Sequence, residues 1–204
     1  MRKILPILLL LALTTAVGAR ADPILYSAVL LGPNESPPNA SPGLGFSLVQ
    51  YDADTHMLGI LAGFTGLTAP VIAAHIHCCV DSPGIAGVAT QLPLFPGFPT
   101  GVTTGFYDRA FDLTDAMSFN PAFVMANGGT ALTAELALAG GLAEGMAYFN
   151  IHTTAFQMGE IRGFLQRVDG GGGGPGAIPE PATLLLVGSG AAMAFIGRRR
   201  RRRK

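Results

Sequence analysis

Short apolar runs separated by turn-forming residues recur through the middle of the chain. Leu44, Phe46 and Leu48 alternate with other residues, the turn 52–55 follows, and the apolar run 57–64 comes next, which predicts an antiparallel hairpin. Further strands are predicted at 24–31, 71–77, 146–152 and 160–168, with loops rich in proline or glycine at 33–42 and 81–105. This pattern is typical of an all-β, mainly antiparallel β-sandwich.

One segment shows the spacing of a helix. Residues 130–145 carry leucine and alanine at helical intervals, although Gly140 and Gly141 are expected to weaken or end the helix. The segment 111–127 is ambiguous, because Pro121 breaks any long helix through it. The expected fold is therefore a β-sandwich with one short helix.

The N-terminus has the three parts of a secretory signal peptide. Arg2 and Lys3 precede the almost wholly apolar run 4–17, and residues 19–21 form a small-x-small cleavage site. We expect signal peptidase to remove residues 1–21, so that the mature chain starts near Asp22. The alternative is a retained N-terminal anchor, for which this apolar run is short.

The C-terminus has the pattern of a membrane anchor. Residues 182–197 carry no charge, and six arginines and a lysine follow at 198–204. A helix of this length reaches about 24 Å, somewhat short of a bilayer core, but flanking arginines can snorkel. The cations are expected to stay in the cytoplasm, which places the preceding domain outside. Residues 169–177 include five consecutive glycines, which predicts a flexible linker.

The tripeptide Pro179, Glu180 and Pro181 stands just before this apolar segment. Together with the span and the arginine tail, it resembles the PEP-CTERM sorting signal of bacterial envelope proteins, over residues 178–204. The resemblance implies that an exosortase, a membrane protease-transpeptidase, removes the anchor and that the protein reaches the cell surface or the extracellular space. It also implies a Gram-negative host that exports polysaccharide. A plain stop-transfer anchor is the alternative.

Without its two ends the chain is acidic. Residues 22–177 contain twelve acidic and three basic side chains, a formal charge of −9, although the whole chain is formally neutral. Such a domain repels nucleic acid and anionic lipid, so we expect no nucleic-acid partner. Exopolysaccharide or surface proteins remain candidate partners.

Three histidines are the strongest candidates for chemistry. His75 and His77 stand at i and i+2 of one predicted strand, which puts both imidazoles on one face, and His152 belongs to another strand. Three imidazoles suit Cu or Zn, and Cys79 would join them if the strand continued. The alternative is structural hydrogen bonding, in which Glu160 or a backbone carbonyl fixes each tautomer. The fourth histidine, His56, lies in a predicted turn.

Two pairs of residues, one adjacent and one separated by a single residue, complete the candidates. Cys78 and Cys79 are the only cysteines, and an oxidising compartment favours a vicinal disulfide between them, with an intermolecular bridge or a metal thiolate as alternatives. Glu160 and Arg162 are expected on one face of the last strand as a structural ion pair, because a buried arginine needs a partner.

The sequence blocks A-H-I-H at 74–77, N-I-H-T at 150–153 and G-E-I-R-G at 159–163 resemble those of the CHRD domain, which is named for chordin. The resemblance covers residues 24–168 and departs from the family at Cys78 and Cys79, where the family usually has a glycine. It implies an immunoglobulin-like sandwich with faint similarity to copper/zinc superoxide dismutase, and no established activity.

A bimetallic dismutase site needs more than the four histidines of this chain, and no nucleophile-elbow, P-loop, Rossmann or zinc-protease motif occurs in it. We therefore expect no enzyme. The expected function is a non-enzymatic binding or structural role at the cell surface or in the extracellular matrix. The alternative is a Cu- or Zn-binding protein that uses His75, His77 and His152, and a redox enzyme built on that site is the least favoured reading.

Overall fold

The computed structural model describes residues 22–168, so the predicted signal peptide, linker, transmembrane segment and sorting signal lie outside the described residues. The described chain is built mainly from strands: β1 (Ile24–Leu31), β2 (Leu44–Asp52), β3 (Met57–Thr65), β4 (Val71–Cys78), β5 (Gly105–Asp112), β6 (Ala147–Thr153), β7 (Ile161–Phe164) and β8 (Gln166–Arg167). Two α-helices, α1 (Pro121–Ala126) and α2 (Ala131–Ala143), and two 3-10 turns, η1 (Gly32–Asn34) and η2 (Ala116–Ser118), complete it.

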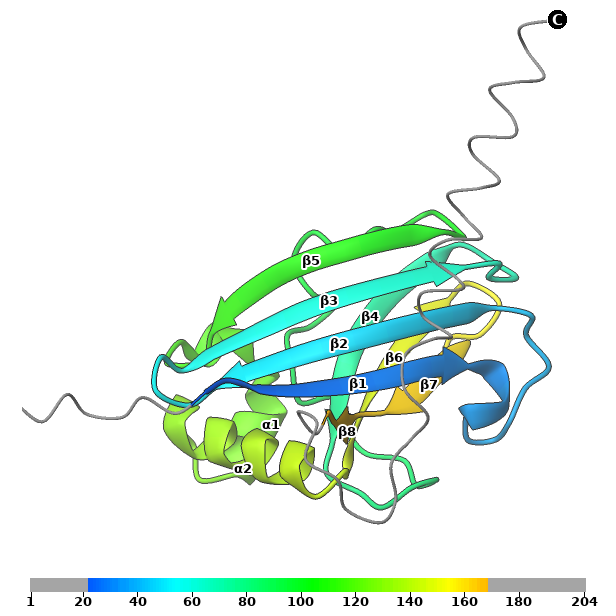
Figure 1. The fold of residues 1–204 in the computed structure, drawn as a ribbon. Helices are drawn as coiled ribbons and strands as arrows, with labels where there is room; N and C mark the ends of the chain where they lie inside the picture. The colour runs from blue at the N-terminus through cyan, green and yellow to red at the C-terminus, as the bar shows by residue number, and fades with distance from the viewer. Residues whose placement is uncertain (1–21, 169–204) are drawn as a thin grey trace, which may run out of the picture. The chain divides into compact units, whose positions relative to one another are not determined.

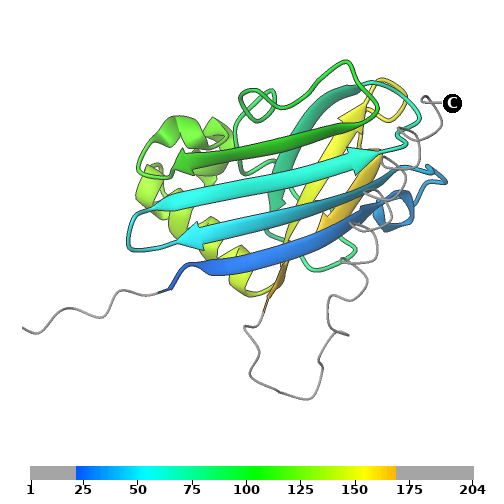
Figure 2. The same ribbon diagram turned by 45° about the horizontal axis from the view of Figure 1, so that its top comes forward.

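All strands join one antiparallel sheet in the order β4-β6-β7-β1-β2-β3-β5, with β8 paired to β1. The mainly antiparallel β class is thus confirmed, but the expected pair of separate sheets is replaced by one sheet. Strand β1 joins the part of the sheet formed by β4, β6 and β7 to the part formed by β2, β3 and β5. It pairs with β2 on one side and with β7 and β8 on the other. The sheet curls into a half-barrel, with β4, β6 and β7 crossing behind β1, β2, β3 and β5 (Figures 1 and 2).

Most strands lie where the hydrophobic pattern predicts them, and one was missed. Strand β5 completes the edge of the sheet beside β3, yet its exposed residues include Phe106 and its alternation is broken by charged residues. The last predicted strand, 160–168, is divided into β7 and β8 at Leu165, whose side chain is buried.

The two helices lie together at one end of the sheet (Figure 1). Pro121 begins α1, with Asn120 as the N-cap that accepts a hydrogen bond from the Ala122 N–H. Helix α2 continues through Gly140 and Gly141, contrary to expectation. At Gly141 a Cβ atom would collide with the Cys78 sulfur, so the glycine allows close packing of α2 against the end of β4.

Strand β6 is buried on both faces, and the candidate residues lie on one of them. One face, with Phe149 and Ile151, packs into the core. The other face carries Tyr148, Asn150 and His152, and backbone carbonyls of the loop between β4 and β5 contact the strands there. Within residues 22–168, no helix has both the length and the apolar character needed to cross a bilayer.

Candidate metal centre

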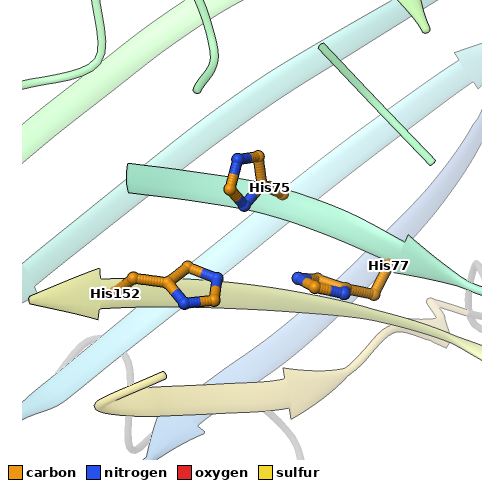
Figure 3. A group of neighbouring side chains, drawn as sticks. All are labelled: His75, His77 and His152. Atoms are coloured by element: carbon orange, nitrogen blue, oxygen red, sulfur yellow. The ribbon is translucent and has the colours of Figure 1, made fainter. Parts of the chain in front are cut away.

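Strands β4 and β6 bring the three predicted histidines together. In the register of this pair, Ala73 lies opposite His152 and His75 lies opposite Asn150, so His152 stands diagonally across from His75. His77 is two residues further along β4, on the same face as His75. One ring nitrogen from each histidine lies within 4.8 Å of those of the other two, and all three side chains are buried. Figure 3 shows the three rings turned toward a common point.

Hydrogen bonds to backbone carbonyls fix the tautomer of each histidine. His75 Nε2 lies 2.6 Å from the Pro93 oxygen, His77 Nδ1 lies 2.9 Å from that of Ala86, and His152 Nδ1 lies 3.0 Å from that of Gln157. A carbonyl oxygen only accepts, so each of these nitrogens carries the proton and donates. The predicted alternative partner, Glu160, bonds none of the three.

The other nitrogen of each ring therefore carries no proton and presents a lone pair. His75 Nδ1, His77 Nε2 and His152 Nε2 are buried, and none has a hydrogen-bond partner among the described residues. A buried acceptor left unsatisfied costs about 1–3 kcal/mol. Three such acceptors in one place could hold a metal ion, because a ligating histidine usually donates its other N–H to a carbonyl or carboxylate.

Burial keeps the cluster neutral. It lowers the pKa of both His75 and His77 from 6.5 to about 4, although the bonds to Pro93 and Ala86 act in the opposite direction. Burial also lowers the pKa of His152. Neutral imidazoles are the form that binds metal, so protons compete little at neutral pH.

The cluster is wider than a metal-loaded site. With bonds of about 2.0–2.1 Å, a tetrahedral ion sets its nitrogen ligands about 3.3 Å apart. The observed separations reach 4.8 Å, so the rings must close by up to about 1.5 Å on binding an ion. Such a movement is within the range of side-chain rotations. The donor set is all imidazole, which suits Zn²⁺ and Cu²⁺.

The two cysteines lie beside the cluster but outside it. Cys78 and Cys79 form a disulfide with each other, so neither offers a thiolate. Cys78 is buried on the core face of β4, and Cys79 is exposed just beyond the strand. Among residues 22–168, the group of side chains that could hold a metal ion contains the three histidines without Cys79.

Arg162 is buried next to the histidines, and its partner differs from the predicted one. Its Nε lies 3.7 Å from Glu35 Oε2 rather than near Glu160. The guanidinium also donates to three backbone carbonyls, those of Asn34, Pro83 and Gly84, and lies 4.7 Å above the centre of the Tyr148 ring. Glu35 is buried too, and desolvation raises its pKa to about 7 against the opposing effect of Arg162.

Glu160 belongs to a separate polar network. Its carboxylate accepts hydrogen bonds from the hydroxyls of Ser41 and Thr153, each 2.6 Å away, and from the Thr68 N–H. Burial alone would raise the pKa of Glu160, but these hydrogen bonds outweigh it and the pKa lies below its ordinary value. The predicted ion pair is not formed because Glu160 and Arg162 turn toward different neighbours.

Sequence reasoning missed Glu35 and the part played by the loop between β4 and β5. Glu35 lies in a proline-rich loop, far along the chain from Arg162, and nothing local marks it as its partner. Asn150 stands inside the N-I-H-T block, two residues before His152, and that spacing on one strand was an available signal.

Comparison with known proteins places the chain in a family. The CHRD domain model matches residues 26–165, and the PEP-CTERM protein-sorting motif matches residues 177–202. No curated protein and no solved structure matches the chain. The sorting motif implies processing by an exosortase and export to the cell surface. Since the CHRD match covers more than half of the chain, the chain belongs to the CHRD domain family.

Proposed function

We propose that this CHRD domain protein is a metal-binding protein of the cell surface or extracellular matrix, which holds one Cu²⁺ or Zn²⁺ ion between His75, His77 and His152. The observation that carries the proposal is the set of three buried ring nitrogens that point together without a hydrogen-bond partner among residues 22–168. A purely structural role requires only the three histidine N–H groups that donate to backbone carbonyls. It does not explain why the three remaining ring nitrogens point toward one another.

The chemistry of the site supports copper or zinc. All three donors are neutral imidazoles, each oriented by a backbone carbonyl, which is the usual environment of a metal-bound histidine. Among divalent ions of the first transition row, Cu²⁺ binds most tightly to a given nitrogen site, and Zn²⁺ accepts a tetrahedral arrangement without penalty. Both ions reach an exported domain from the medium.

The proposed role is binding rather than turnover. We place the domain outside the inner membrane, anchored through 182–197 until exosortase acts, and afterwards at the cell surface or in the extracellular matrix. The acidic domain attracts cations to its surface, which favours capture of a metal ion from dilute solution.

Metal content tests the proposal directly. Residues 22–170 are purified from a periplasm, incubated with Cu²⁺ or Zn²⁺, desalted, and analysed by inductively coupled plasma mass spectrometry. About one equivalent of metal is expected in the wild type, and almost none in the His75→Ala/His77→Ala variant, which loses two of the three ligands.

His56→Ala is the matched control. His56 hydrogen-bonds Glu135 in α2 and is not part of the cluster, so this variant is expected to keep its metal. A wild type that binds neither ion, with a double variant that is only less stable, would show that the histidines serve the fold alone. Metal content that is equal in the wild type, the double variant and His56→Ala would also refute the assignment.

A further inference from the structure

A cavity of about 120 Å³ lies beside the histidine cluster. That volume has room for several water molecules. Two exposed side chains, Ile85 and Met158, border it, so it reaches the surface. His75 is not among the lining residues, and the polar part of the wall consists mainly of Glu35, His77, Tyr148, Asn150, His152 and Arg162.

The cavity wall gathers buried hydrogen-bond acceptors. Besides the lone pairs of His77 and His152, Glu35 Oε1 and Asn150 Oδ1 are buried without a partner among the described residues. Glu35 Oε1 and the Asn150 amide each lie 2.6 Å from the point where a Cβ of residue 159 would stand, so they are within twice that distance of each other. Gly159 has a φ of +127° and leaves this space open. These four acceptors line one cavity, and they call for a cation at the histidines and for a ligand that donates hydrogen bonds to Glu35 and Asn150.

The charges on the cavity wall favour a small anion as a further occupant once the ion is bound. Arg162 is buried, and Glu35 is the one acidic side chain that lines the cavity in the described part of the chain. The three histidines are neutral, so a divalent ion brings two positive charges that the single carboxylate of Glu35 and the positive Arg162 do not balance. Unbalanced buried charge is costly, and a small anion entering from the cavity reduces it.

Resting on the proposed function, we infer that the metal ion keeps one coordination position open to this cavity, where it binds a water molecule that donates hydrogen bonds to Glu35 and Asn150 and that a small anion can replace. Three histidines with a fourth, exchangeable position form an open site, in contrast to the closed sites that only support a fold. The ion meets solvent on the side of His77 and His152, and His75 closes the opposite side.

Solvent relaxation and azide binding test the inference on the full chain, purified in detergent and loaded with one equivalent of Cu²⁺. A copper ion with exchangeable bound water increases the longitudinal relaxation rate of solvent protons. Azide that displaces this water produces a charge-transfer absorption band and lowers the relaxation rate in parallel. We expect both changes, saturating at one azide per copper.

Glu35→Gln and Met158→Ala separate the wall charge from the shape of the cavity. At pH 8, above the Glu35 pKa of about 7, removal of this charge beside the ion removes repulsion of azide, so azide should bind roughly tenfold more tightly in Glu35→Gln. Met158→Ala changes the cavity border without removing a charge or an acceptor, and its azide affinity should stay within about twofold of the wild type. Copper content and circular dichroism are measured on each variant.

The outcomes distinguish this inference from the proposed function. One bound copper with no relaxation enhancement and no azide band means a closed site, which overturns the inference and leaves metal binding intact. An azide affinity that is the same in Glu35→Gln as in the wild type removes Glu35 from the site and overturns its role here. A chain that binds no copper overturns the proposed function, and the open position with it.

Discussion

The pH dependence of stability is the sharpest test of the buried polar face, because two kinds of group titrate there in opposite senses. The folded-state pKa of His75 and His77 is about 4, against 6.5 for a free histidine, so in mildly acidic solution the unfolded chain binds their protons and the folded chain does not. The pKa of Glu35 is raised from 4.5 to about 7, so there the folded chain holds a proton that the unfolded chain has lost.

The sign and size follow from proton linkage. Stability rises with pH wherever the unfolded state binds more protons, by about 1.4 kcal/mol per pH unit for each proton. Near pH 5.5 the two histidines contribute about two protons to the unfolded state and Glu35 about one to the folded state, a net slope of about 1.4 kcal/mol per pH unit. His152 steepens the slope, since its pKa is also lowered. In Glu35→Gln the opposing proton is gone, and the slope should increase to about 2.7 kcal/mol per pH unit.

Urea unfolding of metal-free residues 22–170 at several pH values between about 5 and 6.5 measures this slope; in that window ordinary carboxylates are ionised in both states. Tyrosine fluorescence follows the transition, because the chain has four tyrosines and no tryptophan. The loss of the Glu35–Arg162 contact shifts the whole curve of the variant, whereas the slope reports the protons alone. A Glu35→Gln slope equal to or shallower than that of the wild type would refute the reasoning.

Three further expectations concern stability. Gly141→Ala should lower the free energy of unfolding by about 1–3 kcal/mol, because the added Cβ meets the Cys78 sulfur. Gly140→Ala has open space around the new Cβ and should raise the free energy of unfolding by up to about 1 kcal/mol. Urea unfolding of the two variants measures both changes. Arg162→Leu should cost about 3–5 kcal/mol in the same assay, since it leaves a buried carboxylate and three carbonyls unpaired, and exposed Arg109→Ala less than about 1 kcal/mol. Cu²⁺ at a thousandfold above its Kd should add about 4 kcal/mol to the wild type and nothing to the double histidine variant, as thermal melting will show.

The sequence predicted where most strands lie but not which face of each strand is buried. In β2, Leu44 and Phe46 are 47% and 37% exposed, whereas Ser47 is fully buried. Both faces of this strand carry apolar residues, so the period of two locates the strand without assigning its core side. The sequence also did not predict a single sheet. The pairing of β1 with both β2 and β7 depends on contacts between segments that are distant in the chain.

The candidate site shows the same division between local and distant information. The shared face of His75 and His77 follows from their spacing, and the structure has both on that face. The approach of His152 depends on the register of β4 with β6, which only a cross-strand pairing fixes. The pairing of Glu35 with Arg162 depends on the course of a proline-rich loop, whose path is not encoded by any periodic pattern.

The loop between β4 and β5 and the metal centre depend on the same hydrogen bonds. This loop has little regular structure of its own, so its buried carbonyls need donors from elsewhere. His75 and His77 donate to Pro93 and Ala86, and Arg162 donates to Pro83 and Gly84. Each histidine that holds the loop is thereby fixed in the tautomer that presents its lone pair to the cluster. The order of the loop and the readiness of the site to bind metal are therefore one physical property, and a change that displaces these carbonyls weakens both together.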